Sequence, residues 1–153
     1  MAQQASKPDA YTESYGNWTL RCFNQEGENT DVSSEESNCE VVQNLLKEST
    51  GQRLLMVRFI KVDTHYEMLM IAPFGLILEK GLNLIGDDES ILSGPFRTCL
   101  PVGCIVRLPL TKDQVLGIKQ SENLTASFTN VENHPINIKF SADGLSEALK
   151  RLE

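Results

Sequence analysis

The chain has 153 residues, 41% of them hydrophobic, which suits one domain with a single core better than two separate domains. Acidic residues outnumber basic ones by 21 to 14, and the net charge of −7 repels nucleic-acid phosphates, so we expect no nucleic-acid partner. Apolar runs such as residues 68–72 are far shorter than the roughly 20 residues of a membrane-spanning helix, so we expect no transmembrane segment.

The start of the chain is polar and shows no hydrophobic periodicity over residues 1–14. This predicts a disordered lead-in, followed by a single folded domain over residues 15–153. The first ten residues lack the positive stretch and apolar segment of a signal peptide. We therefore expect a mature exported chain whose signal peptide has been removed and to which Met1 was added.

Alternation of side chains begins after Gly16. Trp18, Leu20 and Cys22 share one face, which predicts a half-buried strand that directs Trp18 and Cys22 into the core. The loop that follows, residues 23–38, is acidic and contains no Lys or Arg. It lacks the alternating oxygen ligands around a glycine turn that a calcium loop needs, so we expect a solvated loop without a metal.

Several aliphatic runs bounded by turn residues predict further strands, and spacings of about 8 to 12 residues favour a sandwich or barrel. These strands cover residues 39–46, 54–62, 66–71, 76–78, 82–85, 96–99, 104–110, 124–129 and 136–140. A capping-box pattern at Thr111 predicts a short helix to about Lys119. Helical spacing of leucines predicts a second helix over residues 142–152, capped by Ser141. The fold class expected is all-β, an antiparallel, jelly-roll-like β-sandwich with a short C-terminal α-helix.

Four cysteines, Cys22, Cys39, Cys99 and Cys104, indicate a disulfide framework made in an oxidising compartment. Because each sequence-local pair joins the ends of strands, we predict the bonds Cys22–Cys39 and Cys99–Cys104 among three possible connectivities. Free buried thiols in a cytosolic protein and a zinc site are the alternatives. The spacing of Cys99 and Cys104 alone barely excludes zinc, but no His lies near the other two cysteines.

The sequence shows no recognisable catalytic constellation. His65 and His134 are the only histidines, and each sits in a polar, turn-like stretch without a nucleophile motif beside it. The acidic clusters at residues 35–36 and 87–89 are interpreted as surface acids rather than as the paired carboxylates of a glycosidase. Since no phosphate-binding glycine motif occurs either, we expect no enzyme activity, no metal and no cofactor.

Five segments, taken in order, resemble the invasion-associated locus B (IalB) family of exported proteobacterial proteins over about residues 15–152. They are Gly16-Asn-Trp-Thr-Leu-Arg-Cys22, Cys39-Glu-Val-Val-Gln43, Pro73-Phe-Gly-Leu-Ile-Leu-Glu-Lys-Gly-Leu-Asn-Leu-Ile85, Pro95-Phe-Arg-Thr-Cys-Leu-Pro-Val-Gly-Cys104 and Ser141-Ala-Asp-Gly-Leu-Ser-Glu-Ala-Leu149. The most specific element is the hairpin that ends in Gly103-Cys104.

The resemblance implies a β-sandwich protein that is periplasmic, secreted or associated with the outer surface and is linked with invasion of host cells. The leading hypothesis is a non-enzymatic binding or accessory protein whose protein partner lies on the host-cell surface or in the bacterial envelope. A periplasmic chaperone or assembly factor is one alternative, which would offer an exposed sheet edge to client strands. A small-ligand carrier is the other, which would hold an apolar cavity between its sheets.

Overall fold

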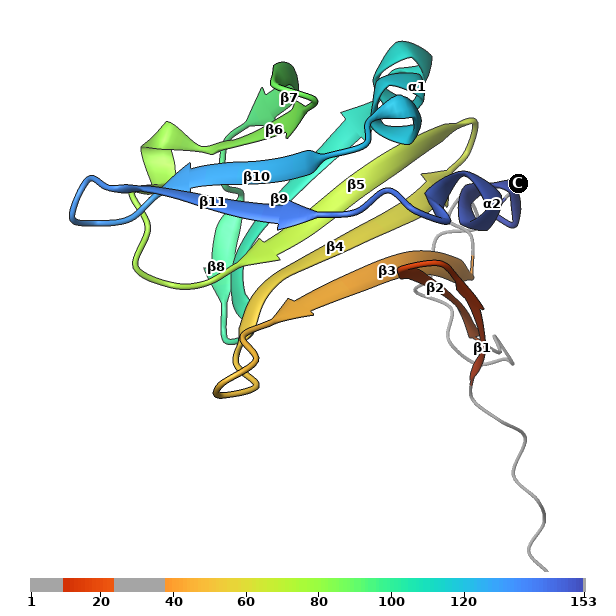
Figure 1. Ribbon diagram of the computed structural model, residues 1–153, viewed down its shortest axis with the longest axis horizontal. Helices are drawn as coiled ribbons and strands as arrows, with labels where there is room; N and C mark the ends of the chain where they lie inside the picture. The colour runs from red at the N-terminus through yellow and green to blue at the C-terminus, as the bar shows by residue number, and fades with distance from the viewer. Residues whose placement is uncertain (1–9, 24–37, 153) are drawn as a thin grey trace, which may run out of the picture.

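The computed structural model describes residues 10–23 and 38–152, which form two antiparallel sheets packed face to face (Figure 1). The larger sheet has seven strands, in the spatial order β1 (Ala10–Tyr15), β2 (Trp18–Phe23), β3 (Cys39–Leu46), β4 (Arg53–Val62), β5 (His65–Ala72), β9 (Gly103–Leu110) and β8 (Thr98–Leu100). The smaller sheet has four, in the order β11 (Pro135–Phe140), β10 (Leu124–Thr129), β6 (Leu82–Gly86) and β7 (Glu89–Gly94).

Three helices complete the described part of the fold: α1 (Lys112–Gln120), α2 (Leu145–Lys150) and the 3-10 helix η1 (Leu78–Lys80). None of them combines the length and the apolar character needed to cross a membrane. The predicted antiparallel sandwich with a short C-terminal helix is confirmed. The connectivity is not that of a jelly roll, however, because β1 to β5 form a meander in which each strand pairs with the next.

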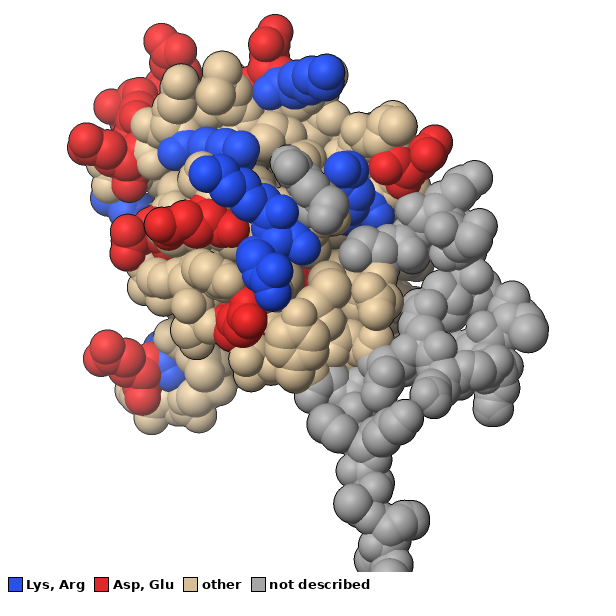
Figure 2. All heavy atoms as spheres, turned by 90° about the vertical axis from the view of Figure 1, so that its right-hand side faces the viewer, with Lys and Arg blue, Asp and Glu red and all other residues tan. Residues whose placement is uncertain are grey.

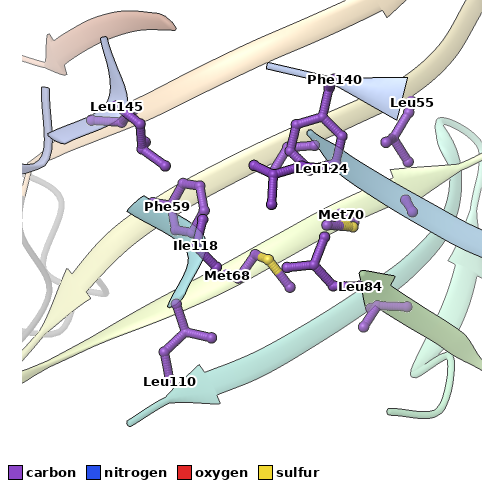
Figure 3. Close-up of a cluster of buried hydrophobic side chains, with 14 of the residues drawn as sticks. Leu55, Phe59, Met68, Met70, Leu84, Leu110, Ile118, Leu124, Phe140 and Leu145 are labelled. Atoms are coloured by element: carbon purple, nitrogen blue, oxygen red, sulfur yellow. The ribbon is translucent and has the colours of Figure 1, made fainter. Parts of the chain in front are cut away.

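The core lies between the two sheets, and Trp18 is fully buried in it, as predicted. Its ring lies 5.5 Å from the Phe59 ring of β4 and meets the Phe140 ring of β11 edge-on at 6.3 Å, so one side chain contacts both sheets. Figure 3 shows side chains from both sheets and both helices pointing toward one another, among them Ile118 of α1 and Leu145 of α2.

Two hydrogen bonds fasten the end of β11 to the larger sheet. The backbone carbonyl of Ser141 accepts from Trp18 Nε1 at 2.9 Å and from Gln43 Nε2 at 3.0 Å. Both donors are buried, so the loss of the acceptor would leave each hydrogen-bond donor unsatisfied and would destabilise the fold. The segment that leads into α2 is thereby held against β2 and β3.

Helix α1 begins as predicted. Thr111 Oγ1 accepts from the Gln114 backbone N–H, and the Gln114 side chain accepts from the Thr111 N–H. The second helix is shorter than predicted and has Gly144 rather than Ser141 as its N-cap. Gly144 adopts a φ of 87°, and a Cβ there would lie 2.0 Å from the Tyr15 carbonyl oxygen, so only glycine allows this approach to the β1–β2 turn.

The predicted disordered lead-in is wrong for residues 10–14, which pair with β2 along their length as part of β1. Residues 1–9 lie outside the described residues. The segment Ala10-Tyr-Thr-Glu-Ser-Tyr15 has no apolar alternation to reveal a strand. Its order comes from tertiary contacts instead, including an ion pair in which Arg151 Nη2 lies 3.2 Å from Glu13 Oε1.

Two further elements differ from the prediction. The expected strand at residues 76–78 is a single bridge, between Leu76 and Asn130, followed by η1, because the chain turns at Gly75 with a φ of 85°. Strand β7 was not predicted. The turn before it is Asp87-Asp88, with both φ values positive, in place of the Asn-Gly or Asp-Gly pair that usually marks such hairpins.

Replacing Leu149 by Ala should lower the free energy of unfolding by about 2–5 kcal/mol, because the side chain is 1% exposed and its removal leaves a cavity. Chemical denaturation monitored by circular dichroism measures this. Lys150→Ala, at the exposed neighbouring position, is the control and should change stability by about 0.5 kcal/mol or less. Equal effects of the two substitutions would contradict the packing described for α2.

Candidate binding surface

The four cysteines form the two disulfides that the sequence predicts. Cys22 and Cys39 lie opposite each other on β2 and β3, and Cys99 and Cys104 lie opposite each other on β8 and β9. Direct cross-strand positions bring the α-carbons to 4.0 and 3.9 Å. No cysteine remains as a thiol. The bridges are therefore structural cross-links at the two sides of the large sheet.

The two histidines lie in different parts of the fold. His65 begins β5, whereas His134 lies in the β10–β11 turn at the other end of the sandwich (Figure 1). Asp87 is not simply a surface acid, since its carboxylate accepts from the backbone N–H groups of Glu122 and Asn123 and ties two turns together. In the described part of the chain, no three His, Cys, Asp or Glu side chains are grouped to hold a metal ion.

Glu35 and Glu36, with the rest of the acidic loop between residues 24 and 37, lie outside the described residues.

The outward faces of the two sheets differ in chemistry. On the smaller sheet, mostly polar side chains point outward, as expected of a face in contact with water: Asn83, Thr125, Ser127, Thr129, Asn137 and Lys139. On the larger sheet, the outward positions of β3, β4, β5 and β9 include a group of seven apolar side chains. These seven, termed the aliphatic face, are Val42, Leu54, Met56, Ile60, Leu69, Ile71 and Ile105.

The strand register makes the aliphatic face continuous across β4, β5 and β9. Met56 of β4 lies opposite Ile71 of β5, which in turn lies opposite Ile105 of β9. Side chains at such positions are within contact distance of one another. Val42 and Leu69 are buried although they are not part of the core between the sheets. Neighbouring side chains on the same face thus shield one another from water.

Charged side chains on this face are already paired with one another. The buried Glu40 carboxylate accepts from Arg58 Nη1 at 2.8 Å and lies 3.6 Å from Arg21 Nη1. The Glu67 carboxylate accepts from Arg107 Nε at 2.5 Å and lies 3.2 Å from His65 Nε2. Glu40 is therefore held by arginines of the two adjacent strands, β2 and β4. Glu67 is held by Arg107 of the adjacent strand β9 and by His65 of its own strand, β5.

The Glu67 carboxyl shows the strength of this pairing. Burial alone raises its pKa, but the hydrogen bonds from Arg107 and His65, with their charges, outweigh burial and bring the pKa below its ordinary value. Because the pKa of Glu67 is lower in the folded state than in the unfolded state, its ionised carboxylate stabilises the fold at pH values above the unfolded-state pKa. That stabilisation is lost as the pH falls through the folded-state value.

One sequence signal could have found the aliphatic face. Residues 68–72, Met-Leu-Met-Ile-Ala, form an unbroken apolar run, whereas a strand with one face in water alternates. Such a run is typical of a strand that is covered on both faces. In the structure all five residues are buried, with Leu69 and Ile71 pointing away from the core.

Removing the disulfide Cys22–Cys39 by the double substitution Cys22→Ala and Cys39→Ala should cost about 3 kcal/mol of unfolding free energy by loop entropy. Its two cysteines are 17 positions apart, whereas Cys99 and Cys104 are five apart. The second pair, replaced in the same way, should therefore cost less, about 2 kcal/mol. Urea unfolding of the two variants compares them, and a larger loss for the shorter loop would contradict this estimate.

Glu67→Gln should lower the free energy of unfolding at pH 7 by about 1 kcal/mol or less, since the pair is partly exposed. The difference in the free energy of unfolding between this variant and the unmodified protein should shrink as the pH falls below about 4.5, where Glu67 becomes protonated on unfolding. Denaturation series at pH 7 and pH 4 test this, with the exposed Glu132→Gln as the control. A difference that grows toward acid pH would contradict the lowered pKa.

The comparisons with known proteins agree with the fold and the segments described above. Residues 18–153 match the family described as Invasion associated locus B (IalB) protein. The chain is 30% identical over 143 residues to an Invasion protein B homolog of Brucella abortus (strain 2308), covering 92% of this chain and 78% of that one. It is 29% identical over 147 residues to Invasion protein B of Bartonella bacilliformis, covering 92% and 74%.

A solved structure shows the same fold. The crystal structure of invasion associated protein b from Bartonella henselae superimposes with a TM-score of 0.78 at 25% sequence identity, covering 93% of this chain and 94% of that one. The chain therefore belongs to the Invasion associated locus B (IalB) family.

Proposed function

We propose that this protein is an exported, non-enzymatic binding or accessory protein that takes part in invasion of host cells and binds a protein partner through its aliphatic face. Relatives at about 30% identity are named invasion proteins. Two disulfides support a location in the periplasm, at the outer surface or outside the cell, where thiols are oxidised.

The observation that carries this proposal is the apolar outward side of the large sheet. Contiguous apolar surface on a folded protein marks an interaction site, and here apolar side chains lie directly opposite one another on three neighbouring strands, β4, β5 and β9. The acids within it, Glu40 and Glu67, already have cationic partners. A fitting partner is therefore a protein surface with aliphatic or aromatic side chains and few charges of its own.

Strand addition at a sheet edge, the mode of the chaperone alternative, has less support. Edge strand β8 is only three residues long. Edge strand β11 begins with Pro135 and carries the exposed Lys139, both of which discourage pairing with another strand. The other two edge strands, β1 and β7, are six residues long each, so the preference for the outward face of the large sheet rests on its apolar side chains.

Ile105→Glu and Met56→Glu should weaken partner binding by about tenfold or more, because each would place an unpaired charge in an apolar interface. Both side chains are partly exposed, so the fold should tolerate the changes. The matched control is Ser127→Glu on the polar outward face of the small sheet. The measurements are capture of the partner from envelope and host-membrane extracts, and invasion by a deletion strain complemented with each variant.

Two results would overturn the proposal. One is equal capture and invasion by Ile105→Glu and Ser127→Glu at equal melting temperature. The other is loss of invasion in His65→Ala, His134→Ala or Glu35→Gln while melting temperature and secretion stay unchanged. The last of these positions lies outside the described residues. Such a loss would point to a specific chemical site and contradict a non-enzymatic role.

A further inference from the structure

A hollow of about 610 Å³ opens at the end of the sandwich, between the β4–β5 turn and α1. Its strand residues Tyr66 and Leu110 point to the core side of the large sheet, away from the aliphatic face, and His65 at the start of β5 also lines it. Its volume falls in the range of small-molecule pockets, about 300–1,000 Å³. The hollow therefore has room for a ligand of modest size.

The floor of this hollow is apolar and rigid. Leu110 and Val115 are 5% and 8% exposed and continue the core to the end of the sandwich. The Tyr66 ring is fixed by its hydroxyl, which donates to the Leu149 carbonyl oxygen at 3.1 Å. Beside the floor, Leu116 of α1 also lines the hollow and is 50% exposed. An aliphatic group placed there would cover apolar surface that now faces water.

The rim of the hollow is basic. Lys61 occupies a core-side position of β4, and its ammonium lies over the Tyr66 ring, 5.5 Å from the centroid. Lys112 and Lys119 stand seven residues apart on α1, at a spacing that places both on one side of the helix. Asp113 is the one acid among the described lining residues.

This local excess of positive charge contrasts with the chain's net charge of −7. Within the described residues, Lys61, Lys112 and Lys119 form no ion pair with an acid. Figure 2 views the end of the molecule where the β4–β5 turn and both helices lie, and it shows Lys and Arg side chains in a diagonal band with Asp and Glu side chains beside it. An anion that arrives here meets cations that are not yet neutralised.

We propose that this hollow binds an anionic amphiphile, a carboxylate or phosphate monoester joined to an aliphatic chain. The chain lies on Tyr66, Leu110 and Val115, and the lysines at the rim attract the head group. The lysines explain why an anion is preferred to a neutral ligand. The apolar floor and the exposed Leu116 explain why an amphiphile is preferred to a small inorganic anion.

Titration of the isotope-labelled full chain with octanoate and with octyl phosphate, followed by backbone amide chemical shifts, tests the proposal. Both ligands should give saturable shifts confined to residues 61–66 and 110–119. Acetate, inorganic phosphate and octanol should each bind about tenfold more weakly, since each lacks one of the two halves of the ligand. Comparing the affinities of octanoate and octyl phosphate shows whether the hollow prefers a carboxylate or a phosphate head group.

The triple substitution Lys61→Gln, Lys112→Gln and Lys119→Gln should weaken binding of both amphiphiles by about tenfold or more. The matched control, Lys47→Gln, Lys80→Gln and Lys139→Gln, removes the same charge at exposed positions elsewhere and should leave the affinity unchanged. Leu116→Asn should weaken octanoate binding while preserving the fold, because this side chain is half exposed.

Equal affinities of the two triple variants would overturn the proposal, as would octanol binding as tightly as octanoate or shifts that fall outside the hollow. If the Lys61, Lys112 and Lys119 variant fails to fold, the salt dependence of octanoate binding to the unmodified protein tests the proposal instead. Octanoate affinity that does not fall between about 0.05 and 0.5 M salt would then refute a lysine-held anion.

Discussion

The double hydrogen bond to the Ser141 carbonyl oxygen determines how the parts of this fold come together. Trp18 of β2 and Gln43 of β3 both donate to it, although they lie about a hundred residues or more earlier in the chain. The interaction fixes the point where the small sheet ends and α2 begins. From there, Gly144 can approach the β1–β2 turn, and α2 can place its leucines on the inner side of the large sheet. The packing of Trp18 against Phe59 and Phe140 depends on the same junction.

Much of this architecture could be predicted from local patterns. The alternation in β2, β10 and β11 identifies strands whose two faces meet different surroundings, and the pairs of cysteines identify strand neighbours. Elements without a clear local sequence signal were missed. Strand β1 is polar and depends on β2 and Arg151, and β7 follows a turn without glycine. The cap of α2 was misplaced because the preference of Ser141 for a capping position ignores the close contact that only Gly144 allows.

The candidate binding surfaces were harder to foresee, since each combines residues from several strands. Sequence periodicity says that a side chain points to one of two faces, but not what lies beyond that face. Only the register shows that Met56, Ile71 and Ile105 stand side by side. Likewise, the lysines of β4 and α1 are 51 or more positions apart in the chain and meet only because α1 covers the end of the sandwich.

Strand β5 has buried apolar side chains on both faces of the large sheet. Met68 and Met70 lie in the core, and Leu69 and Ile71 lie on the aliphatic face. Any substitution that alters its outward side chains also disturbs a strand packed on both sides. Strands β4 and β9 are under a weaker constraint, because their outward residues, such as Met56 and Ile105, are partly exposed. Substitutions on the aliphatic face are therefore accommodated more readily on β4 and β9 than on β5, where the same strand also supplies side chains to the core.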